Sequence, residues 1–199
     1  MIHPHTEVKF INEEVGYGVV ATQFIPAGTI TWVLDQLDRE FTPAQFDAME
    51  PHYKEILETY TFTNNKGHMI LCWDIGRFVN HSFKSNCLTT AYDFEIAIRD
   101  IQPGEQLTDD YGYLNIPEPF EAMDEGTNRT VVYPDDLVNF HEVWDAQIDK
   151  VFDRIIELDQ PLKHLIGSKL WGKVTAITTG NEKMDSILTN YYDPSKSTH

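Results

Sequence analysis

Two short segments of the sequence hold the side chains best suited to chemistry. One is Arg77-Phe78-Val79-Asn80-His81-Ser82 and the other is Asp110-Tyr111-Gly112-Tyr113. They combine the amide and imidazole groups of an Asn-His pair with a tyrosine hydroxyl, which stays neutral at pH 7 because its ordinary pKa is about 10. A third segment, Gly16-Tyr17-Gly18, offers backbone without a Cβ that a ligand could approach closely. A few well-placed donors and acceptors are what a pocket for a small polar ligand requires.

In this order and at this spacing, the three segments resemble the SET domain of protein lysine methyltransferases. Pro26-Ala27-Gly28 and the run Pro103-Gly104-Glu105-Gln106-Leu107-Thr108 extend the resemblance, which covers approximately residues 7–115. Each segment alone is common in proteins, and only their order and spacing together are specific. The resemblance implies S-adenosylmethionine as the cofactor and no metal. It also implies that the methyl acceptor is a lysine side-chain amine in a basic protein segment or histone-like tail.

The resemblance further implies roles for single residues. Tyr111 is the expected catalytic residue, because the family's tyrosine orients the amine and the methyl group rather than acting as a strong base. Tyr60 and Tyr113 are expected to line the lysine channel with aromatic rings, which suit a lysine stem and an alkylated ammonium. The residues expected to bind the cofactor are Gly16, Tyr17, Gly18, Asn80, His81 and Tyr111. Each pattern also has a structural reading, as an ordinary glycine turn, a core histidine or a core aromatic residue in a strand.

Methyl transfer to lysine requires a neutral amine. A free lysine with a pKa of about 10.4 is almost fully charged at pH 7, and selecting its neutral form costs about 4.6 kcal/mol at about 1.36 kcal/mol per pKa unit. A dry channel beside a bound sulfonium would lower the lysine pKa by desolvation and by like charge. The fold must therefore supply a desolvated channel next to the cofactor.

The sequence departs from the family's pattern at two positions near this channel. Asp109 stands two residues before Tyr111, where many relatives carry Phe or Tyr, and Thr89 stands where some relatives carry a tyrosine. Those aromatic residues govern how many methyl groups fit, so the sequence does not reveal the methylation state. An anionic Asp109 near the channel would also alter lysine recognition.

The cysteine-rich zinc clusters that flank many SET domains have no counterpart in these 199 residues. Cys72 and Cys87 do not have metal-ligand spacing, and we expect buried free thiols. We therefore expect a stand-alone SET protein in which other residues cover the adenine. The candidate aromatic residues for that lid are Phe120, Phe140 and Trp144.

The elements that must position these residues are mostly short strands. Turn residues and a β-branched and aromatic bias predict strands at 7–10, 17–23, 29–34, 60–63, 68–72 and 89–99. Thr42-Pro43-Ala44-Gln45 predicts the capped start of a helical insert at about 42–60. We expect a mostly β, β-clip-like SET fold with a pseudoknot at residues 1–116.

The rest of the chain, residues 117–199, is expected to be an acidic linker and a helical C-terminal extension. Its first helix shows apolar residues in steps of three and four, at Leu137, Phe140, Trp144, Ile148, Val151, Ile155 and Leu158. This stripe predicts packing on the core, and a homodimer seam is the alternative.

The net charge of −17 is spread unevenly. Residues 93–160 hold eighteen acidic and four basic residues and so carry −14. Such a surface repels a phosphate backbone, so direct binding to nucleic acid is not expected. It would attract a lysine-rich protein segment, or it is a solvated face that only aids solubility. Neither a membrane-spanning apolar run nor a signal-peptide pattern is present, so we expect an intracellular protein that does not bind membranes, in the cytoplasm or the nucleus.

Three functions remain open from the sequence. The first is an S-adenosylmethionine-dependent protein-lysine N-methyltransferase. The second is a non-catalytic SET-like module that binds basic peptides. The third is a structural or oligomerisation protein whose amphipathic helix at 137–158 is its working part.

Overall fold

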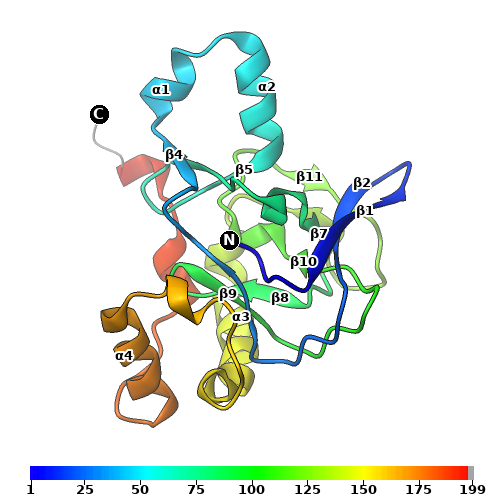
Figure 1. The fold of residues 1–199 in the computed structure, drawn as a ribbon. Coiled ribbons are helices and arrows are strands. Elements are labelled where there is room, and N and C mark those ends of the chain that lie inside the picture. The colour runs from blue at the N-terminus through cyan, green and yellow to red at the C-terminus, as the bar shows by residue number, and fades with distance from the viewer. Residues whose placement is uncertain (197–199) are drawn as a thin grey trace.

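The computed structural model describes residues 1–196 and consists of small strands with a helical C-terminal part (Figure 1). The first six strands are β1 (Thr6–Asn12), β2 (Gly16–Ala21), β3 (Ile30–Val33), β4 (Arg39–Phe41), β5 (Thr61–Thr63) and β6 (Met69–Leu71). The other strands are β7 (Asn80–His81), β8 (Cys87–Thr89), β9 (Phe94–Ala97), β10 (Thr108–Asp109), β11 (Phe120–Glu121) and β12 (Val131–Val132). The α-helices are α1 (Pro43–Asp47), α2 (Pro51–Tyr60), α3 (Asp136–Phe152) and α4 (Ser168–Thr178). Short 3-10 turns lie at Ile75–Phe78, Tyr111–Tyr113, Asp153–Ile156, Lys163–Leu165, Ile187–Asn190 and Pro194–Lys196.

Within residues 1–196 the strands form five small sheets and no closed barrel. Four of these sheets are antiparallel: β1-β2, β3-β9-β8, β4-β6-β5 and β11-β12. The fifth is the parallel pair of β7 and β10, in which Asn80 faces Thr108 and His81 faces Asp109. This pairing brings the Asn-His segment beside the chain that leads into Tyr111, as the predicted pseudoknot requires.

The predicted helical insert is present as α1 and α2, which lie together at the top of Figure 1. Thr42 caps α1: its side chain accepts a hydrogen bond from the Gln45 amide, and the Gln45 side chain accepts one from the Thr42 amide. Pro43 occupies the first turn of α1, and Pro51 starts α2. These residues satisfy or remove the free amides of a helix start, which is why the sequence revealed the insert.

The prediction of one continuous strand at 89–99 is wrong. The structure has two antiparallel strands, β8 and β9, joined by a tight turn. Asp93 adopts a positive φ of 56°, and the Thr90 hydroxyl donates a hydrogen bond to the Phe94 carbonyl. Asp tolerates this left-handed backbone and short hydroxyl side chains close turns, so the local chemistry overrides the apolar alternation.

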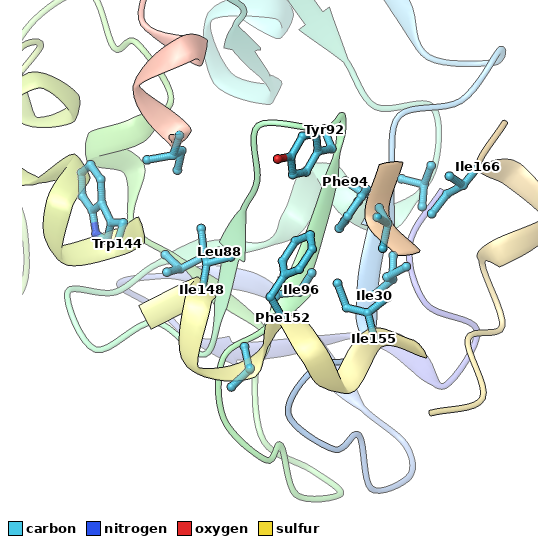
Figure 2. Packing of buried hydrophobic residues seen from close by; sticks show 14 of the residues in the cluster. Ile30, Leu88, Tyr92, Phe94, Ile96, Trp144, Ile148, Phe152, Ile155 and Ile166 are labelled. Carbon is cyan, nitrogen blue, oxygen red and sulfur yellow. The ribbon is translucent and has the colours of Figure 1, made fainter. Parts of the chain in front are cut away.

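Helix α3 packs its apolar stripe against the β3-β9-β8 sheet, and one hydrophobic cluster contains residues from both (Figure 2). Leu137, Ile148 and Ile155 are at most 2% exposed. The apolar stripe is therefore buried against the core of this chain, as predicted from the sequence. Burial of a large aliphatic side chain contributes about 1.5–3 kcal/mol, so the helix is a substantial part of the core rather than an appendage.

The side chain of Gln160 also joins the C-terminal part to the sheet. It donates to the carbonyls of Gly28 and Ile155 at 2.9 and 3.0 Å and accepts from the Ile30 amide at 2.8 Å. Only 6% of Gln160 is exposed, so these hydrogen bonds satisfy buried groups. In the part of the chain that the structure describes, no helix is both long and apolar enough to cross a membrane.

Candidate active site

Tyr111 lies at the start of the 3-10 turn that follows β10, and its orientation is fixed by two hydrogen bonds. The Tyr111 hydroxyl donates to the Val79 carbonyl at 2.6 Å, and the Tyr111 amide donates to Nδ1 of His81 at 3.1 Å. Burial raises the pKa of Tyr111, and the nearby Asp109 and Glu95 raise it further. The hydroxyl is therefore neutral at pH 7 and leaves its oxygen lone pairs available to orient another group.

Tyr111 and Val79 face a pocket of about 570 Å³. The aromatic residues that line it are Trp32, Phe46, Tyr60, Phe62, Tyr111 and Phe120. The Tyr60 ring also packs edge-on to Phe78, with centroids 5.5 Å apart. A largely apolar cavity with a few polar groups is the usual form of a binding site.

Tyr113 lies outside this pocket. It is 2% exposed, packs edge-on against Trp144 at 5.4 Å, and is not among the residues that line the pocket. Successive residues of a 3-10 turn point about 120° apart, so Tyr111 and Tyr113 cannot face the same side. The structure therefore places Tyr113 in the core under α3, and only Tyr60 remains a geometric candidate for the lysine channel.

Two acidic side chains, Glu95 and Asp109, also line the pocket. Burial raises the pKa of both carboxyl groups, and the neighbouring Asp109 raises that of Glu95 further. Sequence reasoning marked Asp109 but missed Glu95. Glu95 alternates with the buried residues Phe94 and Ile96 in β9, a pattern that ordinarily indicates a solvent-facing side chain.

The Gly16–Gly18 segment meets the Asn-His segment through Asn80. The Asn80 amide nitrogen donates to the Tyr17 carbonyl and to Oε1 of Gln106, both at 3.1 Å. A Cβ on Gly18 would lie 2.7 Å from that nitrogen, so only glycine allows this approach. The Tyr17 side chain is 57% exposed and packs edge-on against Phe10.

His81 presents a free donor in the middle of this region. Burial lowers its pKa, so the ring is neutral at pH 7. Because Nδ1 accepts the Tyr111 amide, the proton lies on Nε2, and Nε2 is buried with no hydrogen-bond partner among the described residues. Such an unsatisfied polar atom is costly unless a ligand or water meets it.

Phe120 is the aromatic residue of the C-terminal part that reaches this site. Its ring centroid lies 5.6 Å from that of His81 and 6.3 Å from that of Tyr111. Phe140 and Trp144 instead pack with each other and with Arg129. Of the three candidate lid residues, the geometry therefore favours Phe120.

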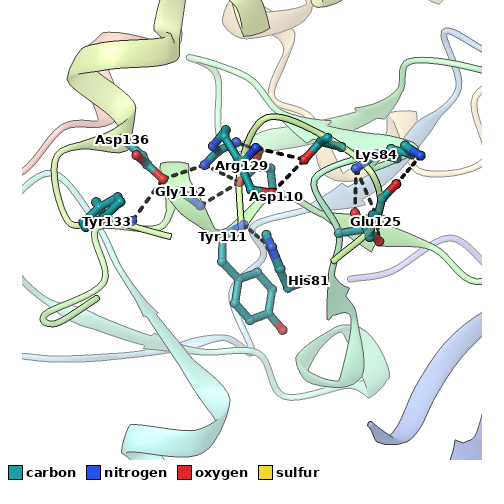
Figure 3. A network of polar contacts seen from close by, with 11 residues as sticks. His81, Lys84, Asp110, Tyr111, Gly112, Glu125, Arg129, Tyr133 and Asp136 are labelled. Carbon is teal, nitrogen blue, oxygen red and sulfur yellow. Dashed lines mark hydrogen bonds and ion pairs between the residues drawn. The ribbon is translucent and has the colours of Figure 1, made fainter. Parts of the chain in front are cut away.

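Arg129, which the sequence did not single out, holds the C-terminal part against the Tyr111 turn (Figure 3). Its guanidinium forms ion pairs with Asp110 and with Asp136 at the start of α3. It also stacks over the rings of Phe83 and Phe140, each at 4.5 Å. Arginine suits this position because its planar group can bind carboxylates and stack on rings at once.

A second contact ties the linker to the Asn-His segment. Glu125 accepts hydrogen bonds from the Ser82 hydroxyl at 2.8 Å and from the Lys84 amide at 3.2 Å. The Lys84 ammonium donates to the Glu125 carbonyl (Figure 3). Glu125 and Arg129 therefore join the linker at 117–130 to the Asn-His segment and to the Tyr111 turn.

These features fit S-adenosylmethionine. Its polar methionine and adenine parts would meet the unpartnered Nε2 of His81, the Asn80 side chain and the backbone at Gly16, where an added Cβ would meet no described atom within 4 Å. Phe120 would supply an apolar surface. Within residues 1–196, no group of three or more His, Cys, Asp or Glu side chains is placed to hold a metal ion.

Comparison with known proteins agrees with this geometry. The family model for the SET domain matches residues 16–112. A curated relative, the histone-lysine N-methyltransferase specific for H3 lysine-9 of Schizosaccharomyces pombe (strain 972 / ATCC 24843), is 30% identical over 145 residues, which is 60% of this chain and 28% of the relative. The chain therefore spans less than a third of that protein's length. The matched residues 16–112 contain the Gly16–Gly18, Asn80-His81 and Asp110–Gly112 segments, so this part of the chain is similar to the SET domain family.

Proposed function

We propose that this chain is a protein-lysine N-methyltransferase that uses S-adenosylmethionine. The observation that carries the proposal is the position of Tyr111, whose oriented, neutral hydroxyl faces an aromatic-lined pocket on one side and whose backbone contacts His81 on the other. The SET domain match over residues 16–112 and the similarity to a curated histone methyltransferase support it.

In this proposal the cofactor would supply a sulfonium methyl group, and the protein supplies position and a dry environment. The lysine stem lies against Tyr60 and Phe62, while the amine reaches the Tyr111 oxygen. Alignment of two reactants in this way lowers the barrier, because the cost of bringing them together is met by binding. Tyr111 acts by accepting hydrogen bonds and orienting the amine.

The proposed substrate is a basic protein segment, with a histone tail as the first candidate. Glu58 and Glu118, two exposed acidic residues, line the pocket. They would face the lysine and arginine residues that flank a target lysine. The relative's specificity for a histone lysine supports the same class of substrate.

The test is transfer of labelled methyl groups from S-adenosylmethionine to a panel of histones, basic proteins and basic peptides. Wild type should label lysine, and Tyr111→Phe should reduce kcat by about 10²-fold or more, the range for loss of a positioned group that acts in the transition state. Tyr133→Phe is the matched control, because Tyr133 is 47% exposed and its side chain makes no contact that the site needs. This control should keep wild-type activity.

Calorimetry with S-adenosylmethionine separates the remaining outcomes. Binding of the cofactor without turnover on any substrate would favour the alternative, a non-catalytic module that holds basic peptides. Absence of cofactor binding would contradict the proposed activity altogether.

A further inference from the structure

The pocket that Tyr60 and Tyr111 line also contains two carboxyl groups, Glu95 from β9 and Asp109 from β10. The two groups act on each other: burial raises the pKa of both, and Asp109 raises that of Glu95 further. Asp109 is 5% exposed. A buried acidic pair on the wall of this pocket requires a chemical reason, because burying charge is costly.

Two buried polar atoms in this pocket lack a partner among the described residues. One is Oδ1 of Asp109, and the other is the indole Nε1 of Trp32, whose side chain also lines the pocket. Trp32 is 6% exposed, so water access is limited. An unsatisfied acceptor and an unsatisfied donor on the wall of one cavity indicate a place for a polar ligand group.

The charges around the pair favour a cation there. Asp110 and Asp74 add negative charge, and the Met1 amino group adds positive charge that acts on Glu95. The hydroxyls of Tyr111 and Tyr113 and the thiols of Cys72 and Cys87 are also titratable groups near the pair. All four stay neutral because burial raises their pKa values. Arg77 lines the same pocket, but its guanidinium donates to the carbonyls of Trp73 and Asp74.

We propose that Glu95 and Asp109 act as one carboxyl pair that binds the ammonium group of the incoming lysine and receives its proton. This inference rests on the proposed function and names the proton acceptor for the same site. Two like carboxyls in a buried site do not both ionise readily, so the pair enters the reaction with one shared proton and one negative charge.

The proton balance is simple. The lysine ammonium gives one N–H proton to the singly charged pair, which leaves a neutral amine and two neutral carboxyl groups. Transfer within a desolvated pocket is favourable because it removes two opposite charges from a medium that solvates them poorly. After methyl transfer the amine nitrogen carries the positive charge again, and the pair releases its extra proton to solvent as the product leaves.

The first experiment measures methyl transfer to a basic peptide as a function of pH for wild type, Asp109→Asn, Glu95→Gln and the variant that carries both changes. The double variant has no carboxyl in the pair to receive the proton and must rely on lysine that is already neutral, so its kcat/KM at pH 7 should fall by about 10²-fold, within the usual range for loss of a general base. Each single variant keeps one carboxyl group and should lose less. The loss should shrink as pH rises toward the pKa of free lysine. Glu13→Gln, which changes an exposed acid outside the pocket, is the control and should match wild type at every pH.

A structural role for the pair would give a different result. It would lower the rate by the same factor at every pH, because the neutral fraction of lysine would no longer matter. That outcome would overturn the proposal. The thermal unfolding of each variant is measured first. If one variant does not fold, the proposal is tested with the variants that do fold and with the NMR titration of wild type described next.

The second experiment needs no methyl transfer, so it separates failure of this inference from failure of the proposed function. The Trp32 indole signal is followed by NMR while n-butylammonium or the isosteric 1-butanol is added to wild type. The ammonium should bind at least 10-fold more tightly than the alcohol in wild type, and this preference should disappear in the variant that carries both Asp109→Asn and Glu95→Gln. Equal binding of the two probes to wild type would overturn the inference, whereas ammonium binding by a protein without transferase activity would overturn only the proposed function.

Discussion

Gly18 is the residue at which a single added methyl group would disturb the cofactor side of the site most directly. A Cβ there would lie 2.5 Å from Oε1 of Gln106, 2.7 Å from the Asn80 amide nitrogen and 2.9 Å from Cγ1 of Ile11. Gly18→Ala should displace the Asn80 side chain and weaken S-adenosylmethionine binding by about tenfold or more, since about 1.4 kcal/mol corresponds to a tenfold change in affinity. Isothermal titration calorimetry measures this directly.

Gly172→Ala is the matched control for that prediction. Gly172 lies within α4, and a Cβ added to it would meet no described atom within 4 Å outside its own helix backbone and chain neighbours. Alanine there should leave cofactor affinity unchanged and stabilise the protein by about 0.5–1 kcal/mol, because glycine is unfavourable within helices. Unchanged cofactor affinity in Gly18→Ala would show that the glycine segment does not shape the cofactor site.

Sequence spacing marked Tyr111, Asn80 and His81 as candidate site residues. The structure brings these three residues together through the β7–β10 pairing. Sequence spacing could not locate Glu95, because period-2 alternation in a strand does not distinguish a solvent-facing side chain from one that faces a cavity. Whether the Glu95 side chain faces solvent or the cavity depends on tertiary packing, and no local sequence pattern reveals it.

At the scale of elements, Arg129 joins the Tyr111 turn to the start of α3. Only 17% of its side chain is exposed, and its partners Asp110 and Asp136 are at most 3% exposed. Arg129→Ala would leave two buried carboxylates without their cation, so it should lower the free energy of unfolding by about 3–5 kcal/mol. Chemical denaturation monitored by circular dichroism measures the change.

Arg99→Ala provides the comparison for an exposed ion pair. Arg99 pairs with Glu105, and their side chains are 48% and 29% exposed. Loss of this pair should cost about 0–1 kcal/mol. Equal destabilisation by the two substitutions would mean that Arg129 does not hold the C-terminal part in place.

Local sequence signals predicted where helices and strands begin better than they predicted which segments contact one another. The capping box of α1 and the glycine-bounded strands β1 and β2 appear at the expected places because their signals are local. The strand expected at 89–99 is a hairpin because the turn at Asp93 outweighs the apolar alternation around it. The linker contacts of Glu125 and Arg129 join positions that are far apart in the chain, and no local pattern announces them.

At the scale of the whole molecule, the SET part and the helical part share one core. The cluster that contains Ile30, Leu88 and Ile96 also contains Leu137 and Ile148 of α3. A fragment of residues 1–116 would expose this face of its sheet to water, and large-to-small losses at single core positions already cost about 2–5 kcal/mol. The fragment should therefore show no cooperative thermal transition, whereas the full chain should unfold cooperatively.

Mixing this fragment with residues 117–199 should restore part of the transition, because the same apolar surfaces would then be covered. Circular dichroism and amide NMR spectra report both results. A fragment of residues 1–116 that melts sharply on its own would show that the division at residue 116 is a true domain boundary.

The uneven charge of the molecule makes a separate prediction about substrate binding. Residues 93–160 carry −14, and exposed Glu58 and Glu118 lie at the pocket. If these charges attract the basic residues around a target lysine, KM for a basic peptide should rise about tenfold or more between about 0.05 and 0.5 M salt, because screening shortens the reach of exposed charges to a few Å. The kcat should change little, since the amine inside the pocket is shielded from salt.

A peptide with neutral residues around the same lysine is the control, and its KM should be nearly independent of salt. The same salt response for both peptides would leave the acidic face with no part in recognition and would assign selectivity to the aromatic and acidic walls of the pocket.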